Sequence, residues 1–247
     1  MWYEGSWLKN ICYAESTDGI SWQRPKLNDD GSNIILPYDN FNDDKHKFFS
    51  VKYLRPDSTA VFIDYNCPKE EKYKLFLRGP GGEFPGIVAT SKDGVNFERF
   101  TATGPVYDRS TIFYNPFRKK WIYSIRWPWK NRARDYVECD DLIEGAAWKK
   151  EDVHHWMCCD DLDLPIGYVR DNPELYNVDC IGYESIMVGL FQILYGPLNV
   201  LCEEYGIPKI TELMPVYSRD GYNFSRPSRE SIINASLCKG SWDRGYV

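Results

Sequence analysis

The chain has 247 residues, a formal net charge of −6 and an aromatic content of 16%. The acidic balance argues against nucleic acid or an anionic membrane as the main partner, and no apolar run is long enough for membrane insertion. The length is sufficient for a large core, and we expect residues 1–247 to form a single domain.

Cysteine and histidine usage gives no metal signature. The sequence has eight cysteines and three histidines, but no Cys-x-x-Cys pair that would indicate a zinc site. His154 and His155 are adjacent, so on a strand they would point to opposite sides. We therefore expect free thiols, no metal site and no cofactor.

One short motif occurs three times along the chain. Its form is Ser-x-Asp-Gly, and it begins at Ser16, Ser91 and Ser218. Each copy follows a β-type run, and Asp-Gly between such runs is a strong hairpin signal because glycine tolerates positive φ. A catalytic group is needed once, whereas a turn recurs in every repeat. We therefore interpret the repeated aspartates as turn residues: Asp18, Asp93 and Asp220.

Between these hairpins the sequence predicts further short strands. They are expected at residues 33–36, 48–53, 59–64, 73–78, 112–115, 119–123 and 134–139. Asp140-Asp141-Leu142 resembles a degenerate copy of the hairpin, and residues 149–178 are loop-rich and acidic. The apolar run 180–195 fits either a buried helix or two short strands. Gly182, Gly189 and Gly196 favour the strands.

The strand groups recur at roughly the length of a propeller blade, about 45–60 residues. We predict an all-β, five-bladed β-propeller that is incomplete at both ends. A two-sheet sandwich is the competing all-β fold, but it does not predict motifs that recur at this spacing.

Several of these stretches resemble five-bladed propeller glycoside hydrolases related to the invertase-like family 32 and the arabinanase-like family 43. The resemblance rests on the opening 1–25 region, Tyr107-Asp108 ahead of 112–116, Tyr183-Glu184, and Trp242-Asp243. It covers nearly the whole chain. It implies a central funnel in which carboxylates from different blades act as nucleophile or base, transition-state stabiliser and proton donor. It also implies that the chain is a fragment lacking the first inner strand and the C-terminal strand.

The resemblance and the residues together indicate three catalytic candidates. Glu184 is expected to donate the proton because apolar flanks favour a protonated carboxyl group. Asp108 would stay ionised and stabilise the transition state, and Asp243 would bind sugar hydroxyls. The alternatives are a loop aspartate for Asp108, a solvent-facing strand residue for Glu184, and a structural ion pair for Asp243. Candidates for substrate binding are Asn33, Arg126, Arg134, Tyr183 and Trp242, with Trp129 as a further stacking residue.

The predicted function is that of a glycoside hydrolase-like protein acting on an oligosaccharide or polysaccharide through carboxylate acid/base chemistry. A glycoside phosphorylase of the mannosyl-phosphorylase type is an alternative, since residues 126–134 carry arginines that could bind phosphate. A non-catalytic carbohydrate-binding propeller is the other. Family analogy favours export, whereas the missing signal-peptide pattern and the cysteines are compatible with the cytoplasm.

Overall fold

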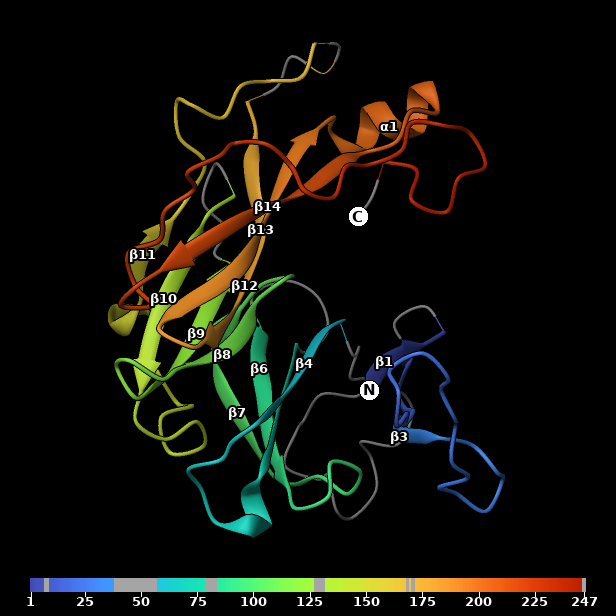
Figure 1. Cartoon of the computed structure of the whole chain (residues 1–247), viewed down its shortest axis with the longest axis vertical. Coiled ribbons are helices and arrows are strands. Elements are labelled where there is room, and N and C mark those ends of the chain that lie inside the picture. Colours follow the sequence, from blue (N-terminus) through green and yellow to red (C-terminus); the bar gives the residue numbers. More distant parts are fainter. Residues whose placement is uncertain are drawn as a thin grey trace. The chain divides into compact units, whose positions relative to one another are not determined.

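The computed structural model describes residues 1–6, 9–37, 57–78, 84–126, 132–167, 169 and 172–245. These residues form four antiparallel sheets, and each sheet is built from strands that follow one another in the chain (Figure 1). The prediction of an all-β protein is confirmed. The chain divides into two compact units, of which unit 1 comprises 1–111 and 141–152, and unit 2 comprises 112–140 and 153–247.

Unit 1 contains two of the sheets. Their strands are β1 (Trp2–Gly5), β2 (Asn10–Tyr13) and β3 (Ile34–Pro37), then β4 (Asp57–Ile63), β5 (Tyr73–Arg78), β6 (Phe84–Ser91) and β7 (Glu98–Val106). Alternate residues of β5 and β6, including Leu75 and Ile87, join Ile11 and Leu36 in one buried cluster. Their neighbours Phe76 and Val88 are also buried. Because successive strand residues point to opposite faces, β5 and β6 are covered on both sides.

Unit 2 contains the other two sheets. The first has β8 (Thr111–Asn115), β9 (Lys120–Arg126), β10 (Arg134–Cys139) and β11 (His154–Met157), and the second has β12 (Glu174–Tyr183), β13 (Ile186–Gly196) and β14 (Ile210–Ser218). A short helix, α1 (Asn199–Tyr205), separates β13 from β14. The central residues of β9, from 121 to 125, are all buried.

The strands expected from sequence agree with the structure in most places. Those predicted at 33–36, 59–64, 73–78, 112–115, 119–123 and 134–139 are confirmed within a few residues. The strand expected at 48–53 lies outside the described residues. Sequence analysis missed β11 and α1.

The apolar run 180–195 forms strands and not a helix, but their boundaries were wrong. β12 begins at Glu174 and not near residue 180, and the turn to β13 is Glu184-Ser185. Gly182 and Gly189 lie inside the strands, at positions where close neighbours leave no room for a side chain. A Cβ on Gly182 would lie 2.7 Å from the Pro116 ring, and one on Gly189 would lie 2.5 Å from the Asp179 carbonyl oxygen. These glycines permit close packing, and they do not mark turns.

All three Ser-x-Asp-Gly motifs form the same turn. The serine Oγ accepts a hydrogen bond from the glycine N–H at 2.8 to 2.9 Å, and the aspartate Oδ1 accepts two more from the N–H groups that follow. The N–H groups of Ile20 and Ser21 lower the pKa of Asp18 to about 2. These contacts confirm the structural role of the repeated aspartates.

The degenerate fourth copy is also confirmed. Asp141 accepts hydrogen bonds from the N–H groups of Ile143 at 2.8 Å and Glu144 at 2.9 Å. The four turns follow β2, β6, β10 and β14, each in a different sheet. The sheets therefore repeat one local plan.

Two of the hairpins pack on the neighbouring sheet of the same unit. In unit 1 the Trp2 indole N–H donates to the Gly94 carbonyl at 2.6 Å. In unit 2 Trp156 donates to the Tyr222 carbonyl at 2.8 Å, and Asn115 Nδ2 donates to the Asp220 carbonyl at 2.9 Å. The turns thus hold sheets together as well as connecting strands.

Replacing Gly221 with alanine is expected to destabilise the protein by about 2–4 kcal/mol, because a non-glycine residue at positive φ is strained and overpacking adds to that cost. Gly221 has φ 71°, and an added Cβ would overlap the Asn115 side-chain amide. Gly19 is the matched control, since its φ is 72° but no atom lies within 4 Å of an added Cβ. Urea unfolding should show the larger loss for Gly221→Ala, and equal losses would contradict the packing argument.

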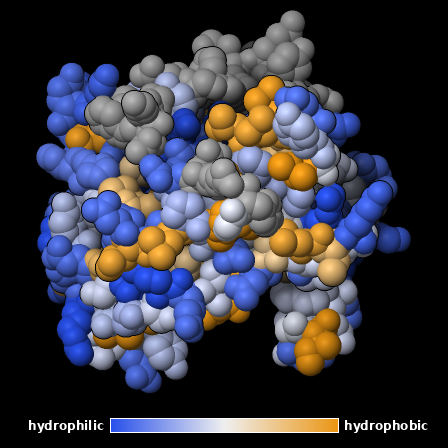
Figure 2. All heavy atoms as spheres, turned by 90° about the horizontal axis from the view of Figure 1, so that it is seen from above, coloured by the Kyte–Doolittle hydropathy of each residue, from blue (hydrophilic) through white to orange (hydrophobic). Residues whose placement is uncertain are grey.

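Figure 2 shows small hydrophobic groups separated by hydrophilic residues on the face drawn there. The most exposed large side chains, including Ile20, Tyr65 and Trp242, come from turns far apart in the sequence. Within the described part of the chain, no helix has the length and apolar character needed to cross a bilayer.

Candidate functional site

Acidic residues stand at the start of the first strand in three successive sheets. Asp57 is the first residue of β4, Asp108 lies in the turn that precedes β8, and Glu174 is the first residue of β12. Sequence analysis selected Asp108 but missed Asp57 and Glu174. The missed signal was the recurrence of an acid at the entry to the first strand of these three sheets.

The entry to β4 carries strained backbone. Ser58 and Arg109 have φ values of 58° and 63°, which non-glycine residues rarely adopt. The Arg109 N–H donates to Ser58 Oγ at 2.9 Å, so the turn containing Asp108 is fastened to the start of β4. Arg78 Nη1 holds Asp57 Oδ2 at 2.7 Å. Backbone strain of this kind concentrates at functional sites.

A pocket of about 220 Å³ in unit 1 adjoins this strained turn. It combines a carboxylate, a guanidinium, hydroxyl groups and aromatic rings, which are the groups that contact sugars in proteins. Its lining residues are Trp2, Tyr3, Glu4, Ile11, Ser58, Thr59 and Arg109. The pocket is smaller than the range of about 300–1,000 Å³ that is usual for ligand sites.

In unit 2, β12 lies beside the sheet formed by β8 to β11 and runs in the same direction as β8. The Arg134 guanidinium, at the start of β10, donates to the Tyr176 carbonyl near the start of β12. At the other end, Gly182 packs against Pro116, which follows β8. Glu174 therefore lies at the end of the sheet where β8 begins.

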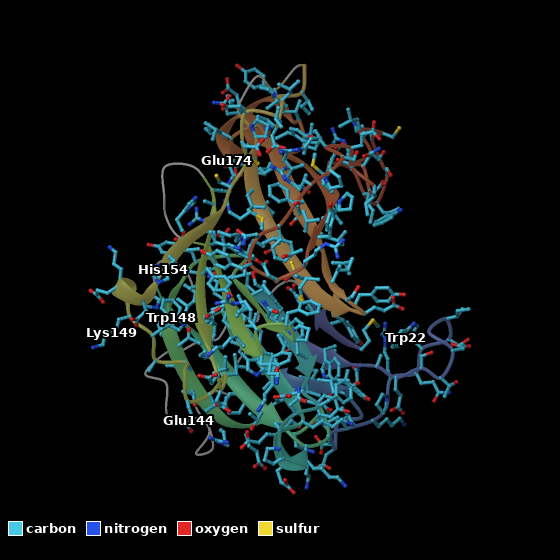
Figure 3. The ribbon with its side chains drawn as sticks, turned by 60° about the vertical axis from the view of Figure 1, so that its left-hand side comes forward. Trp22, Glu144, Trp148, Lys149, His154 and Glu174 are labelled. Atoms are coloured by element: carbon cyan, nitrogen blue, oxygen red, sulfur yellow. The ribbon has the colours of Figure 1, made fainter. Side chains whose placement is uncertain are left out.

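A second pocket, of about 480 Å³, surrounds Glu174 in unit 2. The Arg132 backbone N–H donates to Glu174 Oε1 at 3.1 Å, and Arg132 Nε lies 3.7 Å from Oε2. The Arg132 guanidinium also covers the Tyr176 ring, 4.8 Å from its centroid. Figure 3 shows Glu174 on β12. The other lining residues are Asn172, Leu194, Tyr195, Gly196, Pro197, Leu198, Asn199 and Lys209.

Glu184 does not occupy the apolar strand expected for it. It lies in the exposed turn between β12 and β13 with φ 49°. The desolvation argument for a proton donor at this position was therefore wrong. β12 has ten residues, so at about 3.3 Å per residue Glu184 lies roughly 30 Å from Glu174. A role for Glu184 in catalysis stays a prediction that the geometry of β12 does not favour.

The remaining described acidic and aromatic candidates lie in turns or at a strand end. Asp243 is half-buried and accepts a hydrogen bond from Ser241 Oγ. Trp242 is 93% exposed, and Tyr183 is 62% exposed at the end of β12. An exposed aromatic side chain can stack on a sugar, so their substrate-binding roles stay predictions. Trp129 lies outside the described residues.

The other expected substrate-binding residues have structural contacts. The Asn33 amide donates to Tyr3 Oη at 2.8 Å and to the Tyr13 carbonyl at 2.7 Å. Arg134 is 0% exposed, which leaves no part of its side chain for a sugar to contact. Arg126 ends β9 directly opposite Arg134 and is half-buried. Asn33 and Arg134 thus stabilise strand packing.

Metal-binding and cysteine chemistry have few signs in the structure. In the parts of the chain that are described, no group of three or more His, Cys, Asp or Glu residues could hold a metal ion. All eight cysteines are free thiols. Burial raises the pKa of the Cys180 thiol well above its ordinary value, with a smaller contribution from Asp179, so this thiol is a poor nucleophile.

No protein-family model and no curated protein matches the sequence. The fold does resemble solved structures. An N-acetylgalactosamine deacetylase from F. plautii, solved with blood group B trisaccharide, is 16% identical with a TM-score of 0.58, and the match covers 96% of this chain and 65% of that one. A family 32 β-fructofuranosidase from Bombyx mori, solved with sucrose, is 15% identical with a TM-score of 0.51, covering 90% and 44%.

An endo-1,4-β-xylanase from Bacteroides thetaiotaomicron is 10% identical with a TM-score of 0.48, covering 72% of this chain and 55% of that one. The chain therefore spans between 44% and 65% of the length of these three proteins. At such identities the likeness concerns the fold alone. The chain shares its fold with the F. plautii deacetylase and with the family 32 β-fructofuranosidase from Bombyx mori.

Proposed function

We propose that this chain is a glycoside hydrolase-like protein that acts on an oligosaccharide or polysaccharide. The observation that carries the proposal is the acid at the entry to the first strand of three successive sheets: Asp57, Asp108 and Glu174. Glycosidic bond cleavage needs one carboxylic acid to protonate the leaving oxygen and one carboxylate to meet the positive charge at the anomeric carbon. Acids placed repeatedly at equivalent strand ends supply such a set.

The fold part of the proposal is that residues 1–247 form one β-propeller domain. Each sheet is an up-and-down series of strands, as in a propeller blade. The hairpin turn follows β6, β10 and β14, which are third strands of their sheets, and it also follows β2. By this position β1 corresponds to the second strand of a blade. In a propeller the first strands of all blades surround one axis, and this fold would assign Asp57, Asp108 and Glu174 to the entries of such strands.

Within this proposal the acids have different tasks. Glu174 takes part in proton transfer, and Asp108 stabilises the oxocarbenium-like transition state. Asp57, fixed by Arg78 at 2.7 Å, orients the sugar at the start of β4. Asp243 would bind hydroxyl groups with Trp242 as a stacking face. Glu184 is the competing choice for the proton donor.

The test is an assay of reducing-sugar release from a panel of neutral and acidic oligosaccharides, run with and without inorganic phosphate. The expected result is that the unmodified protein hydrolyses at least one oligosaccharide. An Asp108→Asn variant with an unchanged melting temperature should lose this activity. Cleavage that requires phosphate would identify a glycoside phosphorylase instead. Binding on a glycan array without any turnover would identify a non-catalytic carbohydrate-binding protein. A protein that neither binds nor cleaves any of these glycans would contradict the proposal.

A further inference from the structure

The pocket around Glu174 contains two cationic side chains and one carboxylate. Arg132 and Lys209 line it together with Glu174. Glu174 forms an ion pair with Arg132, because Arg132 Nε lies 3.7 Å from Glu174 Oε2. The second cation, Lys209, is therefore the one whose charge this pair does not balance.

Lys209 lines the pocket from the segment between α1 and β14. The residue is half-buried. Among the residues that the structure describes, no carboxylate lies within 4.0 Å of its ammonium group, whereas Lys74 and Lys120 have such partners at 3.2 and 2.8 Å. A partly buried cation without a carboxylate partner favours an anion in the space beside it.

The rest of the lining suits a sugar. Asn172 and Asn199 are exposed and offer amide groups to hydroxyls, while Tyr195, Pro197 and Leu198 provide apolar surface. The volume of about 480 Å³ falls within the range of about 300–1,000 Å³ typical of small-molecule sites. A neutral sugar would use the amides and the apolar wall but would leave the Lys209 ammonium without a partner.

We propose that this pocket binds a sugar that carries an oxyanion, with Lys209 as the residue that selects the charge. The oxyanion is the carboxylate of a uronic acid or the phosphate of a sugar phosphate, since both offer charged oxygen acceptors to an ammonium group. The inference deepens the proposed function, because Glu174 belongs to the same pocket. Equilibrium binding tests it without any turnover.

The experiment compares matched ligands by isothermal titration calorimetry on the whole protein. The pairs are galacturonic acid against galactose and glucose 6-phosphate against glucose, with inorganic phosphate measured alone. At least one charged sugar is expected to bind about tenfold more tightly than its neutral match, which corresponds to one charge-assisted contact. The pair that shows the preference identifies the oxyanion.

Variants assign the preference to Lys209. Lys209→Met should abolish it, Lys209→Arg should retain it, and Lys239→Met, which removes an exposed lysine outside the pocket, should leave it unchanged. Equal binding of charged and neutral sugars, or a preference that survives Lys209→Met, overturns the inference. Inorganic phosphate that binds as tightly as the sugar phosphate also overturns it, because the site would then recognise the ion alone. If charged sugars bind as expected but no glycan is cleaved, the inference stands and the proposed hydrolase function fails.

Discussion

Replacing Glu174 with glutamine is expected to lower the rate of glycan cleavage by about 10²–10⁴-fold, the usual contribution of a general acid or base. The substitution removes the exchangeable carboxyl group but keeps the size of the side chain. The glutamine carbonyl can still accept the hydrogen bond that Arg132 N–H makes at 3.1 Å. The melting temperature should therefore stay close to that of the unmodified protein.

Glu184→Gln is the matched control for this experiment. The two glutamates flank the same strand, with Glu174 at the start of β12 and Glu184 in the turn after its end. Glu184 is exposed, so its substitution should change neither stability nor turnover. A large loss of turnover in Glu184→Gln with normal activity in Glu174→Gln would reverse the assignment and restore the choice made from sequence.

The contrast between these two glutamates shows where sequence reasoning was limited. The Ser-x-Asp-Gly turns were predictable because all their hydrogen bonds lie within a few residues, as for Asp93 with Val95 and Asn96. The start of β12 was missed because residues up to 178, including the polar Asn177, were interpreted as loop-rich. Asn177 and Asp179 are polar because one side of the strand is partly exposed.

The two pockets were beyond reach of the sequence for a different reason. The Glu174 pocket combines β12, the end of β13, the start of α1 and Lys209, and residues 132 and 209 are far apart in the chain. No local pattern in the sequence records that approach. In unit 1 the link between Arg109 and Ser58 likewise joins residues 51 positions apart.

Replacing Asp163 with asparagine is expected to destabilise the protein by about 3–5 kcal/mol, the usual cost of removing one partner from a buried ion pair. Arg226 grips Asp163 with two hydrogen bonds of 2.7 Å, and Arg229 adds one of 2.9 Å. The Asp163 side chain is 0% exposed and that of Arg226 is 7% exposed. Asparagine cannot neutralise either arginine, so the buried Arg226 would keep only the more exposed Asp160, at 3.4 Å, as a carboxylate partner.

The same cluster makes stability depend on pH. Burial raises the pKa of Asp163, but the hydrogen bonds from Arg226 and the Asp160 N–H outweigh burial, and the pKa lies below its ordinary value. A carboxyl group whose folded pKa is lowered stabilises the protein fully above its unfolded pKa of about 3.9. That contribution disappears as the pH falls through the lower folded value. The stability difference between the unmodified protein and Asp163→Asn should therefore shrink below about pH 4.

Urea unfolding followed by tryptophan fluorescence at pH 7 and at pH 3 measures both effects. Asp161→Asn is the matched control, because Asp161 lies in the same turn but is exposed, and a surface change of this kind usually costs less than about 0.5 kcal/mol. Equal stabilities of the two variants at pH 7 would show that the cluster contributes little. If Asp163→Asn remained much less stable than the unmodified protein at pH 3, the loss of stability would come from altered packing and not from the lost charge. The expected pattern is a large stability difference between the unmodified protein and Asp163→Asn at pH 7 that becomes smaller in acid. This pattern would show that the ion pairs of Asp163 with Arg226 and Arg229 stabilise the packing of the segment after β11 on the segment after β14.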